Sequence, residues 1–377
     1  MKNLIMTPGP TYVHEDVRKA MAKPITNPDI DLSFYEFYKA TTSQLQKLLK
    51  TQNDVLILSG EGILGLEAAC ASLIEAGDRV LCIDNGIFGN GFGDFAKIYG
   101  AKVVYYKSDY EKGLDAQKLK EFLNNDHNFK LATFVHCETP SGITNNIKDI
   151  SLLLKDHNIL TVVDSVAAIG GEELQTDKWH IDVILGGSQK CLSAPPGLTF
   201  LAVSNESWHV MQNRKQDITS FYANLLIWKD WYEKKWFPYT QPISEIYALR
   251  EACERLLADN YLERHYLIAD AVRKSLQKCG LQLYAKNSFS NTVTAVMLPQ
   301  EISFTELYND MLNNYKIMIG GAFGYLKDKI FRIGHMGENC YEEKLYLTLK
   351  ALNNSLKKHN VVLNGQLHLE FVKNINS

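Results

Sequence analysis

Lys190 is the residue of this 377-residue chain whose surroundings point most directly to chemistry. An apolar run ends in Gly186-Gly187-Ser188-Gln189 just before it, and a Pro195-Pro196-Gly197 turn follows it. Small residues let a bulky ligand approach the backbone. A lysine buried at such a strand end is costly as a cation, so burial lowers the pKa of its amine and makes it a nucleophile and base. A solvated loop lysine is the alternative that this segment alone leaves open.

Asp164 ends a second apolar run, in the segment 159–171. A buried carboxylate needs a partner. The pyridine nitrogen of pyridoxal phosphate (PLP) would be one, because an aspartate stabilises its protonated form and the ring then accepts electrons from a carbanion. An aspartate that caps the next turn is the alternative.

Four more segments place informative residues after strand-like runs. Residues 55–69 lead from a strand through a glycine turn into a helix, whose free N–H groups suit a phosphate. Phe88, in a glycine-rich loop, could stack on a flat ring. Thr139 could donate to a ring oxygen. Arg332, the lone charge of an apolar strand, could clamp a carboxylate or form a buried ion pair.

The elements that must position these residues follow a βαβ rhythm. The helices expected between the strands include 62–76, 116–124 and 147–157, and the rhythm predicts an α/β fold with a mostly parallel sheet and ligands at its carboxyl edge. Seven runs rich in β-branched residues read as strands buried on both faces: 54–58, 79–83, 102–106, 131–136, 160–163, 183–185 and 198–203.

The pattern changes after about residue 205. Residues 219–240 are dense in aromatics and predict either core or a subunit interface. A long helix is expected over 246–273, followed by an α+β arrangement with elements at 292–297, 304–313 and 342–357. The predicted organisation is an N-terminal arm (1–20), a large domain (21–255) and a small C-terminal domain (256–377).

Composition excludes several function classes. Hydrophobic residues make up 46% and charged residues 22%, and the net charge is −3 with acid and base mixed. Neither nucleic-acid binding nor a membrane span is therefore expected. The seven cysteines are scattered, which predicts reduced thiols in a cytoplasmic protein and no metal site.

Together these segments resemble the class V aminotransferases of PLP fold type I, above all the alanine–glyoxylate and serine–pyruvate aminotransferases. The resemblance implies a large domain with a mostly parallel seven-stranded sheet flanked by helices and a smaller α+β domain. It covers almost the whole chain and is carried by Thr7-Pro8-Gly9-Pro10, Asn85-Gly86-Ile87-Phe88-Gly89, Asp164-Ser165-Val166-Ala167, Gly187-Ser188-Gln189-Lys190, Ala194-Pro195-Pro196-Gly197 and Arg332-Ile333-Gly334.

The resemblance implies a role for each matching residue. Lys190 would hold PLP as a Schiff base and carry protons. Arg332 would bind the substrate α-carboxylate near Gly9, and Thr240 would reach the phosphate from the other subunit of a homodimer. The remaining cofactor-binding residues would be Asp164 at the ring nitrogen, Phe88 on the ring face, Thr139 at the ring hydroxyl, and Gly62, Ile63 and Gln189 at the phosphate.

Three departures from the family pattern stand out. Glu61 occupies a position of the phosphate turn where relatives often have serine, so it must point away from a phosphate or be paired. Phe237 replaces a tyrosine, for which Tyr239 could substitute. The loop at Asp29 and Asp31 lacks a His-Arg pair that many relatives carry, which puts the usual substrate in doubt.

The expected activity is ping-pong transamination through Lys190, from alanine or serine to glyoxylate or pyruvate. Transamination of 2-aminoethylphosphonate and cysteine desulfuration are disfavoured by Gln189, where those relatives carry Asn and His. A non-catalytic subunit of another complex is the remaining alternative, disfavoured by the presence of Lys190, Asp164 and Arg332 together.

Overall fold

A seven-stranded sheet forms the centre of the fold in the computed structural model, which describes residues 3–376. Its strand order is β2-β10-β9-β8-β5-β3-β4. The strand β10 pairs antiparallel with β2 and β9, and every other neighbouring pair is parallel. The strands are β2 (Asp54–Ser59), β3 (Arg79–Asp84), β4 (Lys102–Lys107), β5 (Leu131–Val135), β8 (Leu160–Asp164), β9 (Val183–Gly187) and β10 (Leu198–Val203). The prediction of a mostly parallel seven-stranded α/β sheet is confirmed.

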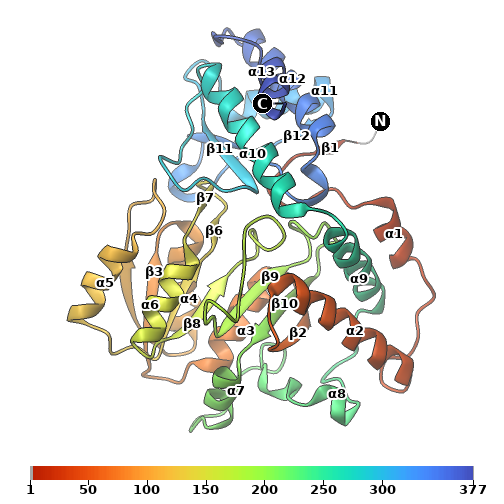
Figure 1. Cartoon of the computed structure of the whole chain (residues 1–377), viewed down its shortest axis with the longest axis vertical. Helices are drawn as coiled ribbons and strands as arrows, with labels where there is room; N and C mark the ends of the chain where they lie inside the picture. Colours follow the sequence, from red (N-terminus) through yellow and green to blue (C-terminus); the bar gives the residue numbers. More distant parts are fainter. Residues whose placement is uncertain (1–2, 377) are drawn as a thin grey trace.

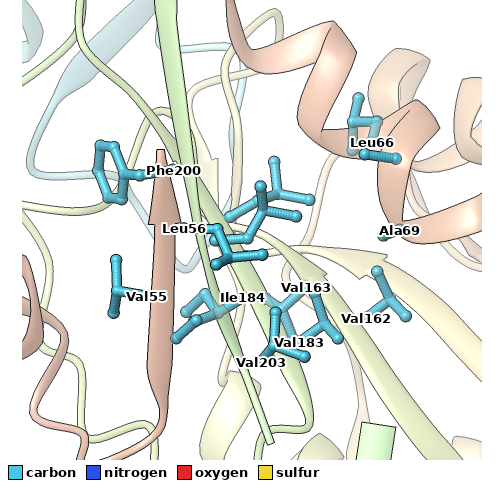
Figure 2. Close-up of a cluster of buried hydrophobic side chains, with 14 of the residues drawn as sticks. Val55, Leu56, Leu66, Ala69, Val162, Val163, Val183, Ile184, Phe200 and Val203 are labelled. Carbon is cyan, nitrogen blue, oxygen red and sulfur yellow. The ribbon is translucent and has the colours of Figure 1, made fainter. Parts of the chain in front are cut away.

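Helices cover this sheet because its inner strands are apolar on both faces. Every residue of β5, β8, β9 and β10 is buried. In Figure 2, Leu66 and Ala69 of α3 lie over valine and isoleucine side chains of β8 and β9. The helices of this part are α1 (Glu15–Met21), α2 (Leu32–Leu49), α3 (Gly62–Leu73), α4 (Ile87–Ile98), α5 (Ala116–Asn125), α6 (Ile147–Asp156), α7 (Asn205–Gln212), α8 (Trp231–Lys234) and α9 (Ile243–Leu257).

The C-terminal part has a core of its own and is drawn mostly in blue in Figure 1. The N-terminal segment joins this part, because β1 pairs with β12 and Met6 is buried in its core. Its elements are α10 (Tyr261–Lys278), β11 (Val293–Met297), α11 (Phe304–Tyr315), β12 (Ile317–Met318), β13 (Ile330–Gly334), α12 (Glu342–Lys358), α13 (Leu367–Ile375) and β1 (Leu4–Ile5), and a small ribbon of β6 (Cys137–Glu138) and β7 (Ile143–Thr144) lies outside the main sheet.

The single helix expected over 246–273 is wrong, because the chain forms α9 and α10 with a break at 258–260. Leu256 of α9 belongs to the core of the sheet, whereas Ile268 of α10 belongs to the C-terminal core. The chain turns between the two helices, so that α9 packs against one core and α10 against the other. The domain boundaries at residues 20 and 255 stay a prediction.

The aromatic segment 219–240 divides between core and surface. Trp228, Trp231 and Phe237 are buried, and Phe237 stacks on Tyr35 with ring centroids 4.5 Å apart. Other aromatic side chains of the segment, Phe221, Tyr222 and Trp236, are about half exposed. Phe237 is therefore part of the hydrophobic core.

Two glycines differ in the space around them, and the difference shows how tightly the sheet is packed. A Cβ on Gly186, in β9, would lie 2.4 Å from Cζ of the buried Phe200, whereas a Cβ on Gly91, inside α4, would meet nothing within 4 Å. We predict that Gly186→Ala lowers the free energy of unfolding by about 1–3 kcal/mol through overpacking. The control Gly91→Ala should raise it by up to about 1 kcal/mol, because alanine is the better helix former. Denaturant titration of both variants checks this, and an unchanged midpoint for Gly186→Ala would contradict it.

Candidate active site

A cavity of about 240 Å³ opens at the carboxyl edge of the sheet. The loops after β3 and β5 reach it at the point where the strand order reverses, the usual ligand position in such sheets. Its lining residues come from the starts of α3 and α4, from β6 and the residue after it, from the end of β8 and the turn that follows, and from the segment after β9: Glu61, Gly62, Ile63, Leu66, Phe88, Cys137, Thr139, Asp164, Val166, Ala167, Gln189 and Lys190. Most of the predicted cofactor residues are thus brought together.

The Lys190 amine lies in this cavity and donates a hydrogen bond to the carbonyl of Pro8 at 2.6 Å. Burial lowers the pKa of the amine, and the Arg332 guanidinium lowers it further, against the opposing effect of Asp164. A lowered pKa increases the neutral, nucleophilic fraction of the amine. The amine lines a cavity and bonds to a backbone carbonyl, so Lys190 is not a freely solvated loop lysine.

Gly9 packs directly against the Lys190 side chain. A Cβ built on Gly9 would lie 2.6 Å from the lysine Nζ, and Gly9 has a φ of +89°, which L side chains rarely adopt. Any larger residue at position 9 would therefore collide with the amine. Gly9 therefore packs against Lys190, and its role in binding a substrate stays a prediction.

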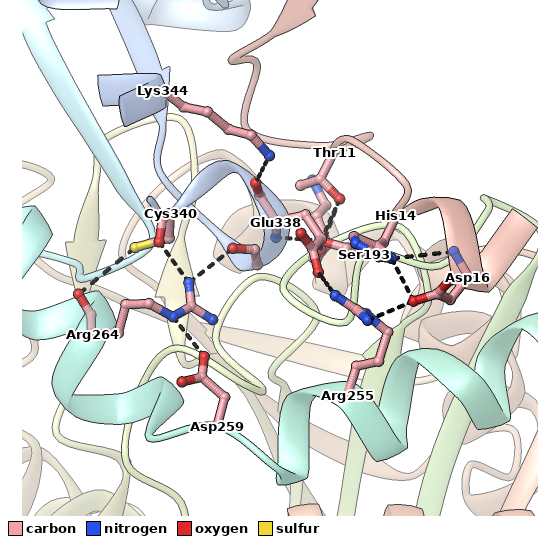
Figure 3. A network of polar contacts seen from close by, with 12 residues as sticks. Thr11, His14, Asp16, Ser193, Arg255, Asp259, Arg264, Glu338, Cys340 and Lys344 are labelled. Atoms are coloured by element: carbon pink, nitrogen blue, oxygen red, sulfur yellow. Dashed lines mark hydrogen bonds and ion pairs between the residues drawn. The ribbon is translucent and has the colours of Figure 1, made fainter. Parts of the chain in front are cut away.

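A polar network fixes the N-terminal segment above the lysine, and Figure 3 shows it. The Thr11 hydroxyl donates to Ser193 Oγ at 3.0 Å, and the backbone N–H of Glu338 donates to the same oxygen at 2.8 Å. Arg255 then pairs with both Glu338 and Asp16. The network ties the N-terminal arm, the loop after Lys190 and the C-terminal part together, and so holds Pro8 in place as the acceptor.

Asp164 is buried at the end of β8, with 7% of its surface exposed. One carboxylate oxygen accepts the backbone N–H of Val166 at 2.9 Å. Burial raises the pKa of the carboxyl to about 6, although the Val166 N–H and Lys190 both oppose this shift. A cationic N–H placed in the cavity would satisfy this buried acid.

Phe88 is positioned by a carboxylate to which the sequence pattern assigned no role. Buried Glu138 accepts the backbone N–H groups of Phe88 and Gly89, at 2.9 and 3.0 Å, at the start of α4. Burial raises the pKa of Glu138 to about 7. A glutamate directly after a buried strand was the available signal, but only the fold shows that it reaches α4.

Arg332 in β13 is a buried cation without a carboxylate in ion-pair contact among the described residues. Its Nε donates to the Gly321 carbonyl at 2.6 Å and its Nη1 to the Thr139 carbonyl at 3.4 Å. Burial lowers its pKa to about 10, although the charge of the more distant Glu138 opposes this shift. The alternative of a buried ion pair is therefore excluded for residues 3–376, and a carboxylate ligand would supply the missing countercharge.

Of two residues expected at the phosphate, Gln189 lines the cavity and Thr240 does not. Gln189 is buried and lines the cavity, and its side-chain oxygen Oε1 has no hydrogen-bond partner in the described part of the chain. Thr240 lies outside the cavity and lines a separate groove with residues 25–29. Its role toward the phosphate of a second subunit stays a prediction.

Glu61 lies at the start of α3, where the sequence predicts a phosphate. Its carboxylate caps the helix by accepting the backbone N–H of Ile63 at 3.1 Å. One of the two N–H groups assigned to a phosphate is therefore already bonded to an anion of the chain itself. The carboxylate does not point away from the helix start, and it has no cation in ion-pair contact among the described residues.

These residues fit PLP at one end better than at the other. Buried Asp164, the Lys190 amine and the Phe88 ring are the groups that a pyridine aldehyde requires, and all three line the cavity. At the phosphate end, the Glu61 carboxylate competes for the N–H of Ile63. The ring and the aldehyde are accommodated, and the phosphate is opposed.

Comparison with known proteins shows to which protein family this chain belongs. The model described as aminotransferase class V matches residues 19–324. An uncharacterised aminotransferase of Methanocaldococcus jannaschii is 36% identical, over 95% of this chain and 94% of its own length. The pyridoxamine–pyruvate transaminase of Mesorhizobium japonicum is 31% identical, over 94% of this chain and 91% of its own.

A solved structure agrees with the sequence matches. The ureidoglycine–glyoxylate aminotransferase of Bacillus subtilis superposes with a TM-score of 0.95 at 30% identity, and the match covers 100% of this chain and 99% of that one. The whole fold described above is thus shared, including the C-terminal part.

The buried acid at position 164 predicts a pH dependence of stability. The pKa of Asp164 is raised from 3.8 to about 6 in the folded ligand-free chain, so folding favours its protonated form. That contribution is present below about pH 4 and lost as the pH rises through about 6. We expect the wild type to lose about 1–3 kcal/mol more than Asp164→Asn between about pH 4.5 and about pH 7.5. Urea unfolding of both proteins measures this, and parallel pH profiles would contradict it.

Proposed function

Because this chain belongs to the class V aminotransferase family, we propose that it transfers an amino group between a small amino acid and a small 2-oxo acid at Lys190. Alanine or serine is the proposed donor, and glyoxylate or pyruvate the proposed acceptor. Relatives named alanine–glyoxylate and serine–glyoxylate aminotransferase, 28% and 29% identical, support this choice. The observation that carries the proposal is a buried Arg332 without a carboxylate in ion-pair contact, among the residues described, beside a lysine of lowered pKa.

Lys190 acts as nucleophile and proton carrier in this proposal. Class V aminotransferases depend on PLP, whose ring accepts the electrons left when a proton leaves the neighbouring carbon. The neutral Lys190 amine would hold the aldehyde of the cofactor, and it is placed to carry a proton to and from the substrate Cα. The Pro8 carbonyl holds Nζ in place at 2.6 Å.

Asp164, Phe88 and Arg332 bind and orient in this account. The Asp164 carboxylate would stabilise a positive charge on the ring nitrogen of the cofactor, and Phe88 would pack on its ring. Arg332 has N–H groups beyond those given to Gly321 and Thr139, and these can pair with a carboxylate. The substrate Cα is then held near the Lys190 amine.

A homodimer with an active site shared across the interface completes the proposal. Thr240 and residues 25–29 lie away from the cavity of their own chain. Nearby apolar side chains are open to solvent, with Ile25 71% and Ile30 77% exposed. Exposed apolar residues of this kind mark an interaction surface.

Cytoplasmic placement is proposed from the thiols. All seven cysteines are free and buried, as in proteins of a reducing compartment. Separately, within the described residues no helix is long and apolar enough to cross a membrane.

Loss of the Lys190 amine tests the proposed activity. We expect the purified chain to convert alanine and glyoxylate to pyruvate and glycine, and Lys190→Ala to slow this conversion by about 10²–10⁴-fold. Lys102→Ala, on the exposed end of β4, is the matched control and should keep full activity. Lactate dehydrogenase coupling measures the pyruvate. Activity retained by Lys190→Ala would contradict the proposal.

The proposed role of Arg332 leads to a second prediction, which concerns the binding of the substrate carboxylate. Arg332→Gln should raise KM for alanine by about 10- to 100-fold, because a charge-assisted hydrogen bond to the carboxylate is lost. The half-reaction of an amine without a carboxylate should change far less in the same variant. Stopped-flow absorbance separates the two substrates, and an equal loss for both would show that Arg332 does not bind the carboxylate.

A further inference from the structure

Glu61 places an anion at the N-terminus of α3, at the rim of the cavity that holds Lys190. Its carboxylate accepts the Ile63 N–H at 3.1 Å. N–H groups in the first turn of a helix are the groups that bind a phosphate, and the helix dipole favours an anion there. A phosphate and the Glu61 carboxylate would therefore compete for one position.

Helix capping alone does not account for a glutamate at this position. Asp115, Asn146, Ser204 and Ser303 cap four other helices through their side chains. These residue types are the preferred N-caps, and glutamate is not among them. A serine at this position would cap α3 equally well and leave room for a phosphate.

The charges around the cavity also oppose a phosphate. Among its described lining residues, Glu61 and Asp164 are carboxylates and Lys190 is the single cation. The pKa of Asp164 is itself raised in part by Glu61, so the two acids already repel each other. A phosphate dianion would add further negative charge to this set.

An uncharged hydroxyl group suits the same position. The Glu61 carboxylate can accept an O–H hydrogen bond, and the side chain of Ile63, 40% exposed, adds an apolar wall. Gln189 lines the same cavity with only 7% of its surface exposed, and its Oε1 has no partner within the described residues. A buried amide oxygen of this kind requires a polar ligand group, and a hydroxyl can donate to it.

We propose that Glu61 makes this site select the non-phosphorylated vitamers, pyridoxal and pyridoxamine, over PLP. The inference rests on the proposed amino-group transfer at Lys190 and names the compound that takes the amino group from the amino acid in its first half. The 5′-hydroxymethyl group donates to Glu61, while Asp164 and Phe88 hold the ring. A relative 31% identical is named for pyridoxamine as its substrate, which supports this assignment.

The reaction that follows balances without an added oxidant. A small amino acid and pyridoxal give a 2-oxo acid and pyridoxamine. Their condensation releases one water, and hydrolysis consumes one water. Lys190 moves the proton from the amino acid Cα to the former aldehyde carbon. The Cα is oxidised to a ketone, and the aldehyde carbon is reduced to the carbon that bears the amine.

Titration calorimetry with pyridoxal and with PLP tests the proposal on the full-length protein. We expect the wild type to bind pyridoxal at least about tenfold more tightly than PLP. Glu61→Ser, which keeps a capping side chain, should shift this ratio toward PLP by about tenfold or more. Glu61→Gln, which keeps the shape without the charge, should give an intermediate ratio. Thermal unfolding confirms that each variant is folded.

The outcomes separate this proposal from the proposed function. A wild type that binds PLP as tightly as pyridoxal, or a ratio unchanged in Glu61→Ser, overturns the selection by Glu61 while leaving transfer at Lys190 intact. A wild type that binds neither compound overturns both.

Discussion

The structure depends on keeping ionisable groups away from water at the carboxyl edge of one sheet. Lys190, Asp164, Glu138 and Arg332 all lose solvent there, and burial is the largest cause of the pKa shift of each. Water is replaced by backbone groups, such as the Pro8 carbonyl for the lysine. These contacts satisfy the groups only in part, so a carboxylate beside Arg332 and a cationic N–H beside Asp164 would complete them, as the proposed function requires.

The fold supplies this edge from distant parts of the chain. The parallel strands bring Asp164 and the loop of Phe88 to one end of the sheet, and β13 of the C-terminal part brings Arg332. The N-terminal arm brings the Pro8 carbonyl to the Lys190 amine and is held by pairing with β12 and by the network at Ser193. Rigid positioning of this kind lets a few side chains share one substrate.

The sheet could be predicted from the sequence because its strands are short and apolar. Asp164 and Lys190 could be predicted because one ends such a strand and the other follows one closely. Glu138 could not, since its importance lies in a contact with Phe88 across fifty residues. The break between α9 and α10 was also missed, because it reflects two separate cores. Glu61 was recognised as unusual, but only the fold shows that it bonds to Ile63. Side-chain contacts between distant segments carry no local sequence signal.

The most direct test is to identify the lysine with which pyridoxal or PLP forms a Schiff base. The chain is incubated with an equimolar mixture of pyridoxal and PLP, reduced with borohydride, digested and mapped by mass spectrometry. We predict that Lys190 is the one modified residue and that it carries mainly the pyridoxal adduct. Modification spread over surface lysines, with Lys190 unmodified, would contradict it.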